Sequence, residues 1–160
     1  MLIRRAILGS VIALTAALTT TGCNFTSHVA SLDYYAPSDG SQADIGRLKA
    51  RNLIFFTDNN GHSGLFGSFA NSGSTKITFA IKYQNASGSS EYREFSVGAY
   101  QVLNFGYQKT KPLEIALSGK PGDMVSVVVY SETDEASINL PIMDATLPQY
   151  TDLVAGLGSN

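Results

Sequence analysis

The sequence has little of what enzymes and metalloproteins commonly use at their active centres. It contains one cysteine, two histidines, three methionines and no tryptophan. A single cysteine excludes an intrachain disulfide, and it also excludes a Cys-x-x-Cys redox or zinc motif. Charged residues make up only 15% of the chain, without a basic cluster of the kind that binds nucleic acid. These absences favour a non-catalytic protein that has no metal, no cofactor and no nucleic-acid partner.

The segment before the only cysteine, Cys23, has the order of a secretory signal peptide. Arg4 and Arg5 precede an apolar run of about a dozen residues, and small residues at 19–22 follow it. A membrane-spanning helix needs roughly 20 apolar residues, and this run is shorter. We therefore expect residues 1–22 to be a signal peptide rather than a retained membrane helix.

The residues around Cys23 resemble the lipobox of bacterial lipoproteins, in which the signal is cut before a cysteine that carries a lipid. Gly22 and Thr21 fit this pattern, whereas Thr20 stands where the lipobox usually has Leu, Val or Ile. The alternative is an ordinary cut nearby, which would leave a free thiol on a secreted protein. The resemblance implies lipidation of Cys23 and a location on the extracytoplasmic face of the cell membrane, with the lipid as the contact to the membrane.

Removal of the signal peptide leaves 138 residues, which is enough for one domain with its own core. Nine basic and 13 acidic residues remain, so the formal net charge becomes −4. We expect four segments in order: a signal peptide at 1–22, the lipidated cysteine and a polar tether at 23–43, a β-sandwich domain at 44–146, and a C-terminal tail at 147–160.

Two of these segments contain residues that do not fit a simple linker. Tyr34 and Tyr35 lie in the tether, where exposed tyrosines would be costly, so this stretch favours packing along the domain. The glycine-rich tail is expected to be loose, although Tyr150 and Leu153 are side chains that can dock onto the domain.

From residue 45 onward the hydrophobic period is two, which is typical of strands. Three segments each present one apolar face, formed by Ile77, Phe79, Ile81 and Tyr83; by Val125, Val127 and Val129; and by Leu48, Ala50 and Ile54. Turn dipeptides such as Asn60-Gly61 and Pro121-Gly122 separate the segments. About seven strands over roughly 100 residues predict an all-β sandwich.

Five short stretches of the chain occur in the order found in one family of lipoproteins. They are "YYAPSDG" (34–40), "ARNLIFF" (50–56), "GLFGSFANSG" (64–73), "PLEIALSGKPGDMVSVVV" (112–129) and "INLPIMDATLPQYTDLV" (138–154). Together they resemble the actinobacterial LpqE-type lipoproteins, which are similar to periplasmic copper chaperones of the PCu(A)C type. The resemblance implies an immunoglobulin- or cupredoxin-like sandwich.

The copper ligands of those chaperones are not reproduced in this chain. The chaperones hold Cu(I) with His and Met, which are soft ligands. Here His28 lies in the tether, His62 lies beside a turn, and Met124 and Met143 are isolated. We expect His62 to be a solvated loop residue and Met124 to have a core or edge role. Metal handling remains the alternative function, by family analogy alone.

Other patterns have both a chemical and a plainer interpretation. Glu91 and Glu94 are three apart, so on a strand they face opposite sides, as they also would on a solvated edge strand. "ETDE" at 132–135 offers oxygen ligands for a hard cation but lacks the regular spacing of a calcium loop, which favours a hairpin tip. The neighbours His62 and Ser63 lie on a tight turn, where adjacent side chains seldom face each other. An enzyme is therefore the least favoured interpretation.

The aromatic residues Tyr100, Phe105 and Tyr107 would form a platform for a glycan or a protein if they shared one surface. Aromatic residues on strands more often belong to the core, so core packing is favoured for them. The sequence thus predicts a non-catalytic binding or accessory module whose partner is a cell-envelope protein or glycan.

Overall fold

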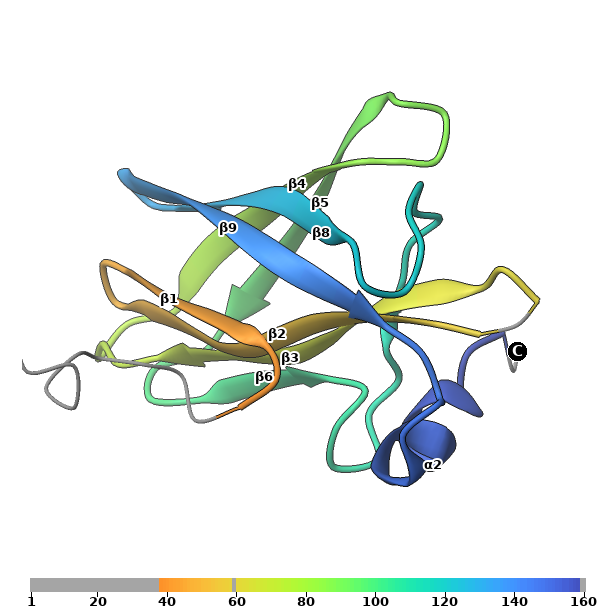
Figure 1. Cartoon of the computed structure of the whole chain (residues 1–160). Coiled ribbons are helices and arrows are strands. Elements are labelled where there is room, and N and C mark those ends of the chain that lie inside the picture. Colours follow the sequence, from red (N-terminus) through yellow and green to blue (C-terminus); the bar gives the residue numbers. More distant parts are fainter. Residues whose placement is uncertain (1–37, 59, 159–160) are drawn as a thin grey trace, which may run out of the picture. The chain divides into compact units, whose positions relative to one another are not determined.

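The computed structural model describes residues 38–58 and 60–158, which form an all-β unit (Figure 1). The predicted signal peptide, Cys23, His28 and the tyrosines at 34–35 lie outside these described residues. Within the described ranges, no helix is long and apolar enough to cross a membrane.

The described chain contains nine strands, a 3-10 helix and a short α-helix. They are β1 (Ser41–Ile45), β2 (Leu48–Thr57), β3 (Ser63–Asn71), β4 (Ile77–Gln84), β5 (Ser90–Val97), β6 (Val102–Phe105), β7 (Leu113–Glu114), β8 (Met124–Ser131), β9 (Asp134–Met143), η3 (Pro148–Tyr150) and α2 (Thr151–Val154). This count exceeds the seven expected strands. β1 begins inside the predicted tether, and β7 has only two residues.

The strands form two layers that share one continuous ladder. The order β5-β4-β8-β9-β2-β3-β6 runs through both layers, with β1 added on β2 and β7 added on β3. The link is a parallel pairing in which Phe55 and Phe56 of β2 lie opposite Ile142 and Met143 of β9. Figure 1 shows β9 crossing obliquely toward β2. The prediction of an all-β, sandwich-like fold is confirmed.

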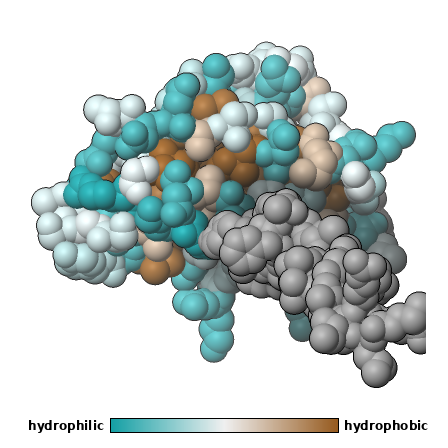
Figure 2. Space-filling view, turned by 60° about the vertical axis from the view of Figure 1, so that its left-hand side comes forward, coloured by the Kyte–Doolittle hydropathy of each residue, from teal (hydrophilic) through white to brown (hydrophobic). Residues whose placement is uncertain are grey.

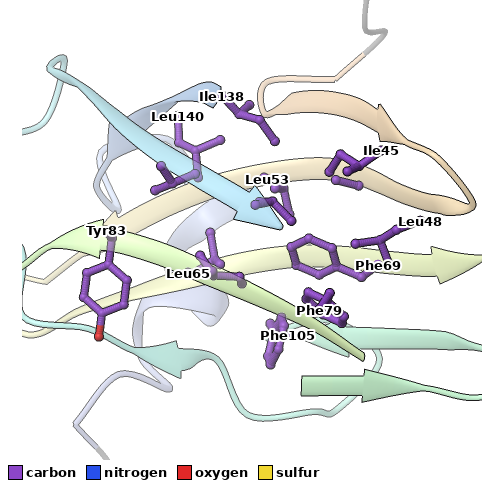
Figure 3. Close-up of a cluster of buried hydrophobic side chains, with 14 of the residues drawn as sticks. Ile45, Leu48, Leu53, Leu65, Phe69, Phe79, Tyr83, Phe105, Ile138 and Leu140 are labelled. Atoms are coloured by element: carbon purple, nitrogen blue, oxygen red, sulfur yellow. The ribbon is translucent and has the colours of Figure 1, made fainter. Parts of the chain in front are cut away.

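The main core lies between the two layers, and the predicted inner faces of β4 and β8 both belong to it. Its buried side chains include Ile77, Phe79, Ile81, Val127 and Val129. Phe69 of β3 meets Phe79 of β4 with 4.6 Å between the ring centroids, which ties one layer to the other. Figure 3 shows these two rings close to Leu65 and Phe105 in the middle of the cluster.

The inner face of β2 differs from the prediction because the strand contains a bulge. Its register with β3 shifts between Arg51 and Ile54, and Asn52 has a left-handed backbone with φ of 49°. The extra residue moves Leu53 into the main core and turns Ile54 to the other face. The assignment of Ile54 to the face of Leu48 and Ala50 is therefore wrong.

A second, smaller hydrophobic cluster lies on that other face of β2. It consists of Ile54, Phe56, Phe66, Tyr150, Val154 and Leu157, with Leu153 partly buried against it. The Tyr150 hydroxyl donates a hydrogen bond to Asp39, just before β1. The expectation of a loose tail is therefore wrong for residues 148–157, whereas the docking of Tyr150 and Leu153 is confirmed.

Candidate functional site

A groove of about 740 Å³ opens where β4 and β8 diverge. The ladder between these strands ends at the pair Lys82–Val128. Beyond this pair, β4 stays bonded to β5 as far as Gln84, and β8 stays bonded to β9 as far as Met124. The groove is lined by Lys82, Tyr83, Gln84, Asn85, Ala86, Ser87, Gly88, Ser90, Ser118, Met124, Val125, Ser126 and Val128.

The lining of the groove combines polar and apolar surface in similar amounts. Four serine hydroxyls, two side-chain amides and one lysine ammonium supply hydrogen-bond donors and acceptors. Met124 is 59% exposed, and it contributes apolar surface together with the half-buried Val128. The described lining contains no histidine, cysteine, aspartate or glutamate. Such a surface can bind a ligand rich in hydroxyl or amide groups.

The loop between β4 and β5, which forms one wall of the groove, is fixed by its own hydrogen bonds. The Asn85 side-chain oxygen accepts a bond from the Ser89 amide at 3.0 Å, and its amide group donates to Glu91 at 2.7 Å. The Ala86 backbone N–H donates to the Ala116 carbonyl at 3.0 Å, which joins the loop to the segment after β7. A wall held in this way loses little conformational freedom when a ligand binds.

Glu91 and Glu94 do not form a catalytic pair. The Tyr83 hydroxyl donates to Glu91 at 2.7 Å, and the Arg93 guanidinium donates to the same hydroxyl at 3.3 Å. Hydrogen bonds from Asn85 and Tyr83 lower the pKa of Glu91. Glu94 lies opposite Ala80 on the other side of the sheet, as the spacing of the two glutamates predicted. Their strand, β5, is an edge strand.

Two tyrosines on the outer face of this layer lie beside the groove. Tyr92 is 60% exposed, and its ring centroid is 6.3 Å from that of Tyr130, with 31° between the planes. The Lys82 ammonium lies 5.6 Å from the Tyr92 ring centroid. Lys82 is the cross-strand neighbour of both Tyr92 and Val128, so the tyrosines and the groove form one continuous surface. We call it the Tyr92 surface.

The aromatic platform that the sequence suggested does not form. Phe105 is buried, and its ring packs against Phe95 with centroids 5.0 Å apart. Tyr107 is half-buried against Phe66, and Tyr100 stands alone among them as a solvent-exposed ring, 72% exposed at a turn. The favoured core interpretation is correct for Phe105. The sequence analysis did not single out Tyr92. The alternation along β5 nevertheless places Tyr92 on the same face as Glu94 and Ser96, opposite to the face of Glu91 and Arg93.

His62 is exposed, as predicted, but its imidazole has a partner. Its Nδ1 atom lies 2.7 Å from an Asp58 carboxylate oxygen. This hydrogen bond raises the pKa of His62 and lowers the pKa of Asp58 to about 2. The adjacent Ser63 hydroxyl donates to the Ile115 carbonyl instead, so His62 and Ser63 do not form a nucleophile and base.

The remaining candidate ligands are spread over the unit. Met124 is exposed at the start of β8, whereas Met143 packs partly buried against the second cluster. Residues 132–135 form the tip of the β8–β9 hairpin, where Glu132 pairs with Arg47. Among the described residues, no group of three or more His, Cys, Asp or Glu side chains is placed to hold a metal ion.

No protein-family model matches the chain, and no curated protein matches it. The resemblance to LpqE-type lipoproteins therefore depends on the short stretches quoted above.

Proposed function

We propose that the protein is a lipid-anchored binding module of the LpqE type, held at the extracytoplasmic face of the cell membrane, with its ligand in the groove beside Lys82. The observation that carries the proposal is the composition of this groove. Its described lining offers many hydrogen-bonding groups, but no carboxylate or imidazole that would activate a serine. This lining therefore favours binding of a ligand over its hydrolysis.

The location in the proposal comes from the sequence. The lipobox-like stretch before Cys23 supports cleavage and lipidation there, and the polar residues after it support a tether. A module tethered in this way meets partners in the cell envelope, so its groove would bind a ligand that lies close to the membrane.

The proposal can be tested by photocrosslinking in intact cells. A photoreactive amino acid replaces Gln84, an exposed residue in the lining of the groove, in the full chain. The matched control carries the same amino acid at Tyr100, which follows the opposite end of β5. We expect a specific adduct from position 84 that is absent from position 100. Equal adducts from both positions, or none from position 84, would contradict a ligand in the groove.

A further inference from the structure

We infer that the ligand of the groove is a neutral polysaccharide whose sugar rings stack on Tyr92 and Tyr130. This inference rests on the proposed binding function and adds the chemical class of the ligand. It draws on three features of the Tyr92 surface, which are the geometry of the two rings, the hydroxyl groups around them and the balance of charge.

The two tyrosine rings lie next to each other on the outer face, where Tyr92 is exposed and Tyr130 is half-buried. Their planes differ by only 31°, and their centroids are 6.3 Å apart. Ala80 occupies the β4 position directly beside Tyr130 and has a small side chain, whereas the Lys82 ammonium lies over the Tyr92 ring, so a sugar that stacks on Tyr92 would meet this ammonium as well. A pyranose ring has an apolar face of C–H groups, so successive sugars can stack on such rings while their hydroxyls stay in contact with water.

Hydrogen-bonding groups continue from the tyrosines into the groove. The Ser126 and Ser137 hydroxyl oxygens lie 3.1 Å apart on the outer face, and Ser126 also lines the groove. Gln84 and Ser90, directly opposite each other on β4 and β5, line the other side. A chain of sugars that leaves the rings would therefore meet hydroxyl and amide groups suited to its own hydroxyls.

The charge around the rings disfavours a polyanion. Lys82 is one cation beside Tyr92, whereas Glu94 and Glu135 lie opposite Ala80 and Tyr130 in the same row across the sheet. One positive and two negative side chains would repel an anionic polymer rather than attract it. This balance favours a neutral polymer.

The same face is poorly suited to a large protein interface. A stable interface covers about 800 Å² on each partner and has an apolar centre. Of the large hydrophobic side chains that are strongly exposed in the described chain, only Tyr92 and Met124 lie on this surface. In the view of Figure 2, the hydrophobic side chains gather in a small central area that hydrophilic ones border.

The test is titration of the full chain with neutral hexasaccharides of glucose, mannose, galactose and N-acetylglucosamine, followed by calorimetry. We expect at least one of them to bind. Tyr92→Ala and Tyr130→Ala should each weaken binding about tenfold, whereas Tyr92→Phe, which keeps the ring, should stay within about threefold of the wild type. Tyr100→Ala removes an exposed tyrosine at the turn beyond the opposite end of β5 and should leave binding unchanged.

Two results would overturn the inference. One is that no hexasaccharide binds, and the other is that Tyr100→Ala weakens binding as much as Tyr92→Ala does. The crosslink at position 84 distinguishes a wrong ligand class from a wrong proposed function. A protein adduct at position 84 that Tyr92→Ala abolishes would keep the binding module and replace the glycan with a protein. Absence of both the adduct and sugar binding would overturn the two proposals together.

Discussion

Replacement of Phe79 by alanine tests the central contact between the two layers of the sandwich. Phe79 is 2% exposed and lies on β4, the strand with the clearest alternation. Its ring centroid is 4.6 Å from that of Phe69 in the opposite layer and 5.6 Å from that of Phe95 on β5. Truncation would therefore remove contacts with both layers and leave a cavity between them.

The expected loss in the free energy of unfolding is about 3–5 kcal/mol, the usual range for a buried Phe→Ala change. Natural domains have only about 5–15 kcal/mol in total, so the variant should be close to unfolding at ambient temperature. Ile81→Ala, at a fully buried site on the same face, should cost about 2–5 kcal/mol. Thr78→Ala lies on the exposed face of the same strand and should change stability by about 0.5 kcal/mol or less.

Urea unfolding followed by circular dichroism measures these differences in chains that all carry Cys23→Ser to remove the proposed lipid. The slope of the transition should stay constant across the variants, so that midpoints report stability. If Phe79→Ala and Ile81→Ala both changed stability by less than about 0.5 kcal/mol, the assignment of the inner face of β4 would be refuted.

Three further predictions concern Cys23, copper and His62. Cys23→Ser should release the protein from membranes or leave its signal uncut, and intact mass should show diacylglycerol on wild-type Cys23; a mature chain with a free thiol would contradict lipidation. Residues 24–160 should retain no stoichiometric Cu(I) against a mild chelator, because the described His62 and methionines are dispersed; one retained equivalent that His62→Ala abolishes would favour metal handling. NMR titration should give His62 a pKa above 6.5 that falls in Asp58→Asn, and an unchanged value would refute the hydrogen bond. Because the folded pKa is raised, the stability from this pair should be present below pH 6.5 and lost as pH rises through the folded pKa.

The alternation of apolar residues was sufficient to predict β4 and β8, because each strand buries one face in the core and stays in a single register. It failed on β2, where Asn52 takes a left-handed backbone and shifts the strand by one residue. The reason lies far along the chain: the Asn52 side chain donates to the Tyr107 hydroxyl and accepts from the Gly40 amide. No local pattern contains those partners.

The candidate site was less accessible to sequence reasoning than the fold. The groove exists because the ladder between β4 and β8 stops at Lys82 and Val128, which is a property of pairing between distant segments. Tyr92 and Tyr130 are 38 residues apart, and only the order of strands in the sheet brings their rings together. The alternation of residues along β5 does, however, place Tyr92 on the polar face of that strand.

The hydrogen bonds among Tyr83, Glu91 and Arg93 have a consequence for how copies of the protein behave when they are close together. β5 is the last strand in its layer, and its outer edge could in principle accept a strand from another molecule. Glu91 and Arg93 stand on the inward side of this strand, so edge-to-edge pairing would enclose their charges beside a new backbone. If the proposed lipid anchor holds copies of the protein side by side on a membrane, their local concentration is high, and these two charges would discourage them from aggregating through β5.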